Sequence, residues 1–277
     1  MNINCNGTLI SLENPKVMGI LNVTPDSFFD GGFYQHEEAV LTQAKQMIAD
    51  GADFIDIGGY SSRPGAADVS EKEELNRVLP VVEMLVQEFP HIPLSIDTFR
   101  SNIAGACIEA GAAMINDIYA GQKDANMLSV IAKTRVPYVM MHMQGTPKTM
   151  QLQPRYTNII KEILYFFSER IAVANSYGIN DIIIDAGFGF GKTLDHNYEL
   201  LSQLEVLHIN ELPLLVGVSR KSMIYKTLGI TPDEALNGTS VLHTVALQKG
   251  AHILRVHDVK EAKECIKLVN RLKTQRT

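Results

Sequence analysis

The sequence predicts an α/β protein of the (β/α)8 TIM barrel class, folded as a single domain with an N-terminal β-hairpin. Eight short and almost entirely apolar runs recur along the 277 residues, and segments with helical periodicity lie between them. Strands of this kind that alternate with helices form parallel sheets covered on their outer face. Eight such units in about 250 residues close into a barrel. A doubly wound open sheet is the alternative, and the number of units favours the barrel.

The expected strands follow a short N-terminal segment. Residues 1–16 are predicted to form a hairpin that plugs the bottom of the barrel, with its turn at Asn6-Gly7, and residues 17–277 form the barrel. Each barrel strand is an apolar run that ends in polar or glycine residues. The runs are VMGILN (17–22), FIDIG (54–58), PLSID (93–97), AMIND (113–117), YVMMHM (138–143), DIIIDAG (181–187), LLVGVS (214–219) and HILRVHD (252–258).

The segments between the runs show the apolar spacing of amphipathic helices. In residues 37–51 this spacing places Val40, Ala44 and Met47 on one face, and Gly51 is expected to end the helix. Residues 71–89 and 197–207 repeat the pattern. No linker, low-complexity segment or charge block divides the chain.

Composition limits the classes of function. A formal charge of −6 gives no general attraction to nucleic acid, so an anionic ligand must be held by a few local cations. The N-terminus lacks a signal-peptide pattern, and no apolar stretch is long enough to span a membrane. Cys5, Cys107 and Cys265 suggest neither a disulfide framework nor a zinc site. We therefore expect a cytoplasmic protein that binds no nucleic acid and no membrane.

Polar side chains end all eight expected strands. In a TIM barrel the functional groups lie at these C-terminal ends and in the loops after them. A single Asp in such a place is most simply a helix cap, but the repetition around the whole barrel favours a site. The residues are Asn22, Asp56, Asp97, Asn116, His142, Asp185, Ser219 with Arg220 and Lys221, and Arg255 with His257.

Three of these acids lie inside apolar runs and are expected to point into the barrel mouth. Buried carboxylates need partners, and the two adjacent N–H donors of a 2-aminopyrimidine edge would suit Asp56, Asp97 or Asp185. Asn116 both donates and accepts, which suits a heterocycle. The alternative is that the acids pair with Arg255 or Lys221.

Cations gather at the same end of an otherwise acidic chain. Arg255 and His257 are two residues apart on one expected strand, and Asn22 lies on the neighbouring first strand. Together they form a plausible clamp for a diphosphate and its Mg²⁺, although Arg255 also has a purely structural interpretation. Arg63, Arg220 and Lys221 are the other cations at this end.

Three segments stand out by their composition. Residues 22–34 and 58–66 combine Gly and Pro with aromatic and charged residues, and we interpret them as lids over the barrel mouth. GFGFGK (187–192) lacks the full spacing of a phosphate-binding P-loop, so its glycines are expected only to shape the turn after the sixth strand.

Several of these segments together resemble the dihydropteroate synthase family, from about residue 16 to residue 270. Many long blocks in the same order make the resemblance more specific than any single motif. The blocks are MGILNVTPDSFFDGG (18–32), GADFIDIGGYSSRPGA (51–66), SIDTFR (95–100), INDI (115–118), MHMQGTPKTMQ (141–151), DAGFGFGK (185–192), GVSRKSMI (217–224) and RVHDV (255–259).

The resemblance implies a transferase of folate biosynthesis. Such an enzyme moves the 6-hydroxymethyl-7,8-dihydropterin group from its pyrophosphate ester to p-aminobenzoate in an SN1-like displacement, and releases 7,8-dihydropteroate and pyrophosphate. It also implies Mg²⁺ as cofactor, sulfonamide inhibition and a homodimer.

The resemblance further implies roles for individual residues. Asp97, Asp185 and Asn116 match the positions that hold the amino-pyrimidine edge of the pterin, and Lys221 matches one at its other edge. Asn22 matches the Mg²⁺ ligand. Arg255 and His257 match the pyrophosphate clamp; Phe28, Pro64, Phe190 and Ser222 match the p-aminobenzoate pocket; Ser62 matches a substrate contact, and Asp56, Arg63, Ile118, Met141 and Gly217 are further substrate-binding candidates.

The segment GGYSSRPGA departs from the family pattern at Tyr60 and Ser62. Serine keeps the hydroxyl of the commoner threonine, so the departure puts the shape of the pocket in doubt more than the reaction. Two other functions stay open: a pterin-binding methyltransferase module, which has no use for a diphosphate clamp, and a non-catalytic pterin-binding relative. The presence of Asn22, Arg255 and His257 argues against the methyltransferase.

Overall fold

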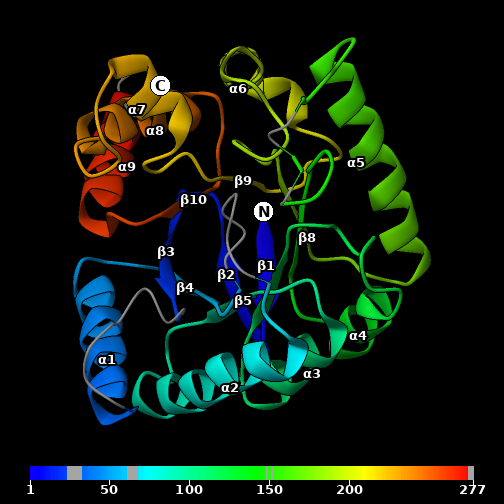
Figure 1. Cartoon of the computed structure of the whole chain (residues 1–277), viewed down its shortest axis with the longest axis vertical. Helices are drawn as coiled ribbons and strands as arrows, with labels where there is room; N and C mark the ends of the chain where they lie inside the picture. The colour runs from blue at the N-terminus through cyan, green and yellow to red at the C-terminus, as the bar shows by residue number, and fades with distance from the viewer. Residues whose placement is uncertain (24–32, 61–67, 148, 151–152, 274–277) are drawn as a thin grey trace.

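Eight parallel strands close into a barrel in the computed structural model of the chain, which confirms the predicted fold class. The structure describes residues 1–23, 33–60, 68–147, 149–150 and 153–273. The barrel order is β10-β3-β4-β5-β6-β7-β8-β9, and the helices surround it (Figure 1). The strands are β3 (Lys16–Asn22), β4 (Phe54–Gly58), β5 (Leu94–Asp97), β6 (Met114–Asp117), β7 (Tyr138–Met141), β8 (Ile182–Asp185), β9 (Leu214–Val216) and β10 (Ile253–Val256).

The helices occupy the segments between the strands, as their periodicity predicts. Gly51, with φ at +96°, follows the first helix at the expected place. The segment 197–207 is not one helix, because the chain breaks at Gln203 between an α-helix and a 3-10 turn, η2 (Leu204–Leu207). The α-helices are α1 (Phe33–Ala49), α2 (Glu71–Glu88), α3 (Ser101–Glu109), α4 (Met127–Thr134), α5 (Ile159–Ser176), α6 (Leu194–Ser202), α7 (Ser222–Leu228), α8 (Leu236–Gln248) and α9 (Val259–Lys273). None of the helices in the described ranges is long and apolar enough to cross a membrane.

The N-terminal hairpin closes the bottom of the barrel, as predicted. Strands β1 (Asn2–Cys5) and β2 (Thr8–Ser11) pair antiparallel, and Asn6 and Gly7 have the positive φ angles of 49° and 87° that a tight hairpin turn requires. Ile3 and Leu12 are 1% exposed and pack on side chains from the first residues of the barrel strands. The division of the chain at residues 16 and 17 stays a prediction, and β3 itself begins at Lys16.

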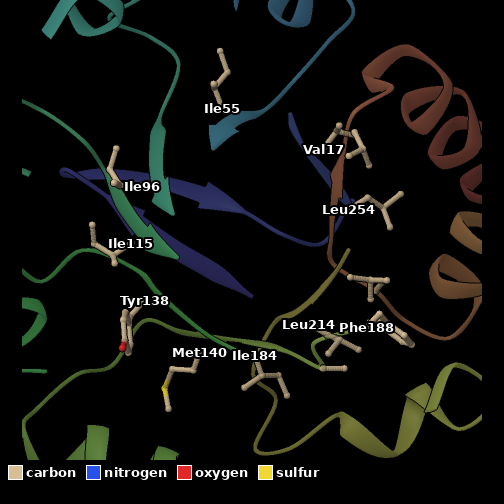
Figure 2. Packing of buried hydrophobic residues seen from close by; sticks show 14 of the residues in the cluster. Val17, Ile55, Ile96, Ile115, Tyr138, Met140, Ile184, Phe188, Leu214 and Leu254 are labelled. Atoms are coloured by element: carbon tan, nitrogen blue, oxygen red, sulfur yellow. The ribbon is translucent and has the colours of Figure 1, made fainter. Parts of the chain in front are cut away.

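Side chains alternate between two cores along each strand. The outward-facing residues form the larger core between the strands and the helices, and Figure 2 shows Ile55, Ile96 and Leu254 arranged around the ring of strands. The inward-facing residues fill the barrel with apolar side chains at the bottom, such as Phe54, and with polar ones above, such as Asp56. This period of two places the acids of β4, β5 and β8 inside the barrel.

Four strands end earlier than the sequence predicts, and β8 is one of them, because it ends at Asp185 and not at Gly187. His142, Ser219 and His257 lie in loops because β7, β9 and β10 end at Met141, Val216 and Val256. After β9 the chain turns, with Arg220 at a φ of +53° and Lys221 N donating to the Val218 carbonyl over 3.2 Å. The prediction that Arg255 and His257 share one strand was therefore wrong, although His257 follows the strand directly.

Candidate active site

Arg255 joins two carboxylates inside the barrel mouth. Its Nε donates to Asp56 Oδ2 over 2.6 Å, and its Nη2 donates to Asp97 Oδ2 over 2.8 Å. Asn116 Nδ2 donates to the same Asp56 oxygen over 3.0 Å. Asp56 and Asn116 are buried, and Asp56 Oδ1 has no hydrogen-bond partner among the described residues. The pairing of acids with Arg255 that the sequence left open is thus present, and one fully buried carboxylate oxygen is left over.

Asp97 is the more exposed of the two carboxylates that Arg255 joins. Its side chain is 20% exposed, whereas that of Asp56 is fully buried. Burial raises the pKa of Asp97 to about 7; Arg255 opposes this shift and the charge of Asp56 adds to it. Asp97 therefore changes its charge near neutral pH.

Asp185 and Lys221 form the opposite side of the mouth. Asp185 Oδ1 accepts from Gly187 N over 2.8 Å, and burial raises the pKa of this carboxyl while Lys221 opposes the shift. Lys221 Nζ donates to the Phe188 carbonyl and lies 4.8 Å from the centroid of the Phe190 ring. Burial lowers the pKa of Lys221 to about 8, and Asp185 counteracts this. The loop after β8 therefore contacts both Asp185 and Lys221.

Two glycines lie where side chains of the mouth come close to one another. A Cβ atom added at Gly58 would lie 3.7 Å from Asn22 Oδ1 and 3.6 Å from Asp97 Cβ. One added at Gly217 would lie 3.8 Å from Lys221 Nζ and 3.9 Å from Arg255 Cβ. Asn22 and Asp97 therefore both lie beside Gly58, and Lys221 and Arg255 both lie beside Gly217.

His257 directly follows the end of β10 and lies near the loop between β9 and α7. His257 is exposed, with its Nδ1 3.1 Å from Ser219 Oγ and its backbone N–H donating to the same hydroxyl over 3.2 Å. Ser222, at the start of α7, is half-buried. Arg220 is not an available cation of the mouth, because its Nε and its Nη2 each donate to a carboxylate oxygen of Asp258 over 2.8 Å.

A wall of apolar side chains borders the acids. Phe99, Ile118 and Met141 are buried together, and Phe190 packs against them partly exposed. Tyr60, where the sequence departs from the family pattern, makes an edge contact with Phe99 at 5.3 Å between ring centroids. Four of the predicted site residues, Phe28, Ser62, Arg63 and Pro64, lie outside the described residues.

A buried hydrogen-bond network beside Asp97 is not predicted by the sequence analysis. Glu74 on α2 is fully buried and accepts from Thr98 Oγ1 over 2.7 Å and from Arg100. Arg100 Nη2 also donates to the Val69 carbonyl over 2.7 Å. Glu74 reads as an ordinary charged residue in an amphipathic helix, so only its contact across 24 positions of sequence shows its place.

Comparison with known proteins shows the family to which the chain belongs. The model of the family described as "Pterin binding enzyme" matches residues 18–257. Dihydropteroate synthase of Escherichia coli K12 is 46% identical over 97% of this chain and 95% of its own length. The chain belongs to the dihydropteroate synthase family. As a member of that family it is a transferase.

Solved structures of dihydropteroate synthases share the whole fold. The Yersinia pestis enzyme in complex with a sulfonamide drug has a TM-score of 0.93 and 47% identity, and covers 99% of this chain and 100% of its own. The Xanthomonas albilineans enzyme with 4-aminobenzoic acid has a TM-score of 0.92 and 41% identity, with 98% of both chains covered. The family resemblance seen in the sequence is thereby confirmed.

Proposed function

We propose that this chain transfers the 6-hydroxymethyl-7,8-dihydropterin group from its pyrophosphate ester to p-aminobenzoate, and releases 7,8-dihydropteroate and pyrophosphate. One observation carries the proposal: buried acids and an amide lie beside Arg255 and Lys221 in one barrel mouth. A pterin offers N–H donors to the acids, and its pyrophosphate offers negative charge to the cations. Membership of the dihydropteroate synthase family supports the same reaction.

The pterin belongs with the acids and the amide. Asp97 and Asp185 accept from its amino-pyrimidine edge, Asn116 supplies both a donor and an acceptor, and Lys221 meets its other edge. Ile118 and Met141 are apolar and buried next to Asp97's neighbour Phe99, which suits the flat faces of a heterocycle. Asp56 Oδ1, buried without a partner in the described structure, is a further acceptor.

The pyrophosphate belongs with the cations at the end of β10. Arg255 offers a planar set of donors, and His257 is exposed beside it. Mg²⁺ fits beside Asn22, whose hard amide oxygen lies near Gly58 and Asp97, because Mg²⁺ usually takes few protein ligands. We propose that phosphate oxygens and water supply most of the ligands of this ion. Such an ion would neutralise charge on the leaving group.

The p-aminobenzoate belongs between Phe190 and Ser222. Phe190 presents a partly exposed ring at the mouth, and Ser222 offers a hydroxyl to the carboxylate. The Xanthomonas albilineans relative was crystallised with 4-aminobenzoic acid and the Yersinia pestis relative with a sulfonamide, which supports the same pocket and the same inhibitors here. The parts assigned to Phe28, Ser62, Arg63 and Pro64 stay predictions.

The reaction follows from where charge develops. If the C–O bond breaks before the amine attacks, positive charge spreads into the pterin and negative charge grows on pyrophosphate. Asp97 and Asp185 stabilise the cation, while Arg255 and His257 stabilise the leaving group. The weak aniline nucleophile then needs no general base to attack, since its excess proton leaves afterwards.

The free chain is also proposed to be a cytoplasmic homodimer. Large apolar side chains are exposed on adjoining helices at the end of the chain, with Val241 on α8 54% exposed and Leu268 on α9 68% exposed. A pair of such faces buries apolar area when two copies associate. The three cysteines are free and buried, in keeping with a reducing compartment. Light scattering on the eluting protein tests the dimer.

Product analysis separates this function from its two rivals. Purified protein is incubated with dihydropterin pyrophosphate, p-aminobenzoate and Mg²⁺, and both pyrophosphate and dihydropteroate are quantified. Equal amounts of the two products are expected. A methyltransferase module would release no pyrophosphate, and a non-catalytic relative would bind pterin without turnover; either result would overturn the proposal.

A further inference from the structure

Lys192 is buried beside the candidate active site, and the proposed reaction gives it no part. It ends the glycine-rich segment 187–192, and it is 2% exposed. In the part of the chain that the structure describes, it is the only lysine buried to this degree. A buried ammonium is costly unless it is fully hydrogen-bonded, so its contacts indicate what it does.

Four acceptors from two loops surround the Lys192 ammonium. Its Nζ lies 2.9 Å from the Gly187 carbonyl oxygen, 3.1 Å from that of Phe190, 3.4 Å from that of His142 and 3.0 Å from His142 Nδ1. Burial lowers the pKa of Lys192 to about 7, and the charge of Asp185 opposes this shift. In its ammonium form Lys192 has three N–H donors and accepts nothing, so His142 accepts from it through a neutral imidazole. Burial, with the neighbouring Lys192 charge, lowers the pKa of His142 to about 2, which keeps the imidazole neutral.

The loop around the ammonium lies too close to its neighbour for a side chain to fit between them. Gly187 has a φ of +68°, and a Cβ atom there would lie 1.9 Å from the His142 carbonyl oxygen. At Gly191, with a φ of +63°, an added Cβ would lie 2.4 Å from the Gln144 carbonyl oxygen. Backbone therefore packs on backbone, and Lys192 is the side chain that links the two loops.

The same loop holds two groups of the proposed site. The Phe188 carbonyl accepts from Lys221 Nζ, and the Phe190 ring lies 4.8 Å from that nitrogen. Gly187 N donates to Asp185 Oδ1 over 2.8 Å. A change in the path of this loop would thus move the contacts of Lys221 and Asp185 together.

We propose that Lys192 is a positioning residue, whose ammonium holds the loop of residues 187–191 so that Phe188 and Phe190 fix Lys221 in the active site. The inference rests on the proposed function, because it gives Lys221 and Phe190 their substrates. Without the ammonium, the Phe190 carbonyl loses its donor and the Gly187 carbonyl keeps only the Phe190 N–H, at 3.1 Å, so the loop is driven toward water. Both Lys221 and the p-aminobenzoate pocket then lose their fixed geometry.

Lys192→Met is the direct test, since methionine has a similar length and no donor. We expect kcat to fall and the KM for p-aminobenzoate to rise, each about tenfold. A merely structural role would reduce the fraction of folded enzyme and hence the apparent kcat, with KM unchanged. Kinetic constants within about twofold of the wild type in folded Lys192→Met would overturn the inference.

Two further comparisons guard against loss of folding and loss of activity. Lys263→Met removes a lysine–aspartate contact to Asp53 outside the site and is the matched control, with KM expected to stay unchanged. If Lys192→Met does not fold, His142→Leu removes one acceptor while His142→Asn keeps one; only the leucine variant is expected to raise the KM, and equal KM values would overturn the inference.

A crystal structure of Lys192→Met gives a readout that does not depend on turnover. We expect residues 187–191 to move and Lys221 to lose its bond to the Phe188 carbonyl. An unmoved loop with that bond intact would overturn the inference even if the wild-type enzyme proved inactive. An inactive wild type would itself contradict only the proposed function.

Discussion

Arg255 forms ion pairs with two acids, and in the proposed reaction at least one of them, Asp97, binds the pterin instead. It bridges Asp56 and Asp97 in the ligand-free protein, at 2.6 Å and 2.8 Å. A buried ion pair offsets much of its own desolvation cost, so its exchange for a new set of partners need not cost much net free energy. When a pterin occupies Asp97 and pyrophosphate arrives at Arg255, each substrate part replaces one half of the pair. We therefore expect the pairing of Arg255 with the acids to give way to its proposed contact with pyrophosphate when the substrate binds.

Asp97→Asn should lower kcat/KM by at least about tenfold, or ~1.4 kcal/mol of barrier, because the amide cannot stabilise a cationic pterin. Asp56 still holds Arg255 in this variant, so the melting temperature should stay close to that of the wild type. Steady-state kinetics and thermal unfolding measure the two effects. The control is Asp53→Asn, outside the site, which loses its pairs with Lys16 and Lys263 and should keep its activity. Wild-type turnover in Asp97→Asn would remove its electrostatic role.

The pH dependence of kcat/KM should have two limbs that belong to different residues. Burial raises the pKa of Asp97 to about 7, so the carboxylate that the pterin needs forms as the pH rises through that value. Burial lowers the pKa of Lys221 to about 8, so its ammonium is lost as the pH rises further. We expect a maximum between these values, measured on the free enzyme from about pH 5.5 to 9.5. Loss of the Lys192 ammonium, whose pKa burial lowers to about 7, adds to the descending limb. Lys221→Gln should therefore reduce that limb without removing it, and a flat wild-type profile would contradict the assignments.

The loop between β8 and α6 depends on glycine for two separate reasons. Gly187→Ala introduces both a strained positive φ and a contact 1.9 Å from the His142 carbonyl oxygen. Gly178 also has a positive φ, of 78°, but nothing lies within 4 Å of an added Cβ. Gly178→Ala should therefore cost about 1 kcal/mol of strain, whereas Gly187→Ala should cost more than about 3 kcal/mol and also lower activity.

Denaturant unfolding of the two glycine variants separates strain from collision. The free energy of unfolding should fall for both, and kcat should fall only for Gly187→Ala, because that loop contacts Asp185 and Lys221. Equal losses of stability in the two variants would mean that the backbone at His142 moves away from an added Cβ at little cost in free energy. The loop would then be less closely fixed than its contacts imply.

The sequence predicts elements well where one rule governs them. FIDIG (54–58) coincides with β4, because a strand buried on both faces is apolar apart from its functional residue. The run at 214–219 is too long, because β9 ends where the chain turns toward Lys221, and hydropathy does not register a turn inside an apolar run. Such ends depend on which backbone groups find partners in the neighbouring strand.

Some features of the candidate site can likewise be predicted from the sequence, and others cannot. Alternation along the strands predicts that Asp56 and Asp97 point inward, but it cannot reveal that Arg255 lies between them, because 199 positions separate Asp56 from Arg255. Lys192 carries a signal, a lysine that ends a run of glycines, yet its spacing does not match a known phosphate loop. Its acceptors are backbone carbonyls, which any sequence supplies, so only the folded loop shows what it binds.

Residues that stabilise the fold and residues of the candidate site lie at opposite ends of the barrel axis. Apolar side chains and the hairpin fill the bottom, while charged groups line the mouth above them. TIM barrels commonly divide their strands in this way, which lets the loops change without loss of the fold. In this protein the boundary runs along β4, where Phe54 belongs to the lower core and Asp56, two residues later, belongs to the site.

This division predicts that the hairpin can be weakened without a change in substrate binding. Leu12 is 1% exposed in the lower core, so Leu12→Ala should lower the free energy of unfolding by about 2–4 kcal/mol through a cavity. Leu9, on the same hairpin, is 71% exposed, and Leu9→Ala should change stability by less than about 0.5 kcal/mol. Urea unfolding gives the stabilities, and KM for both substrates should match the wild type in both variants at a temperature where each is folded. If Leu12→Ala raised either KM, the bottom and the mouth of the barrel would be coupled, and the hairpin would be part of the site's support rather than a plug.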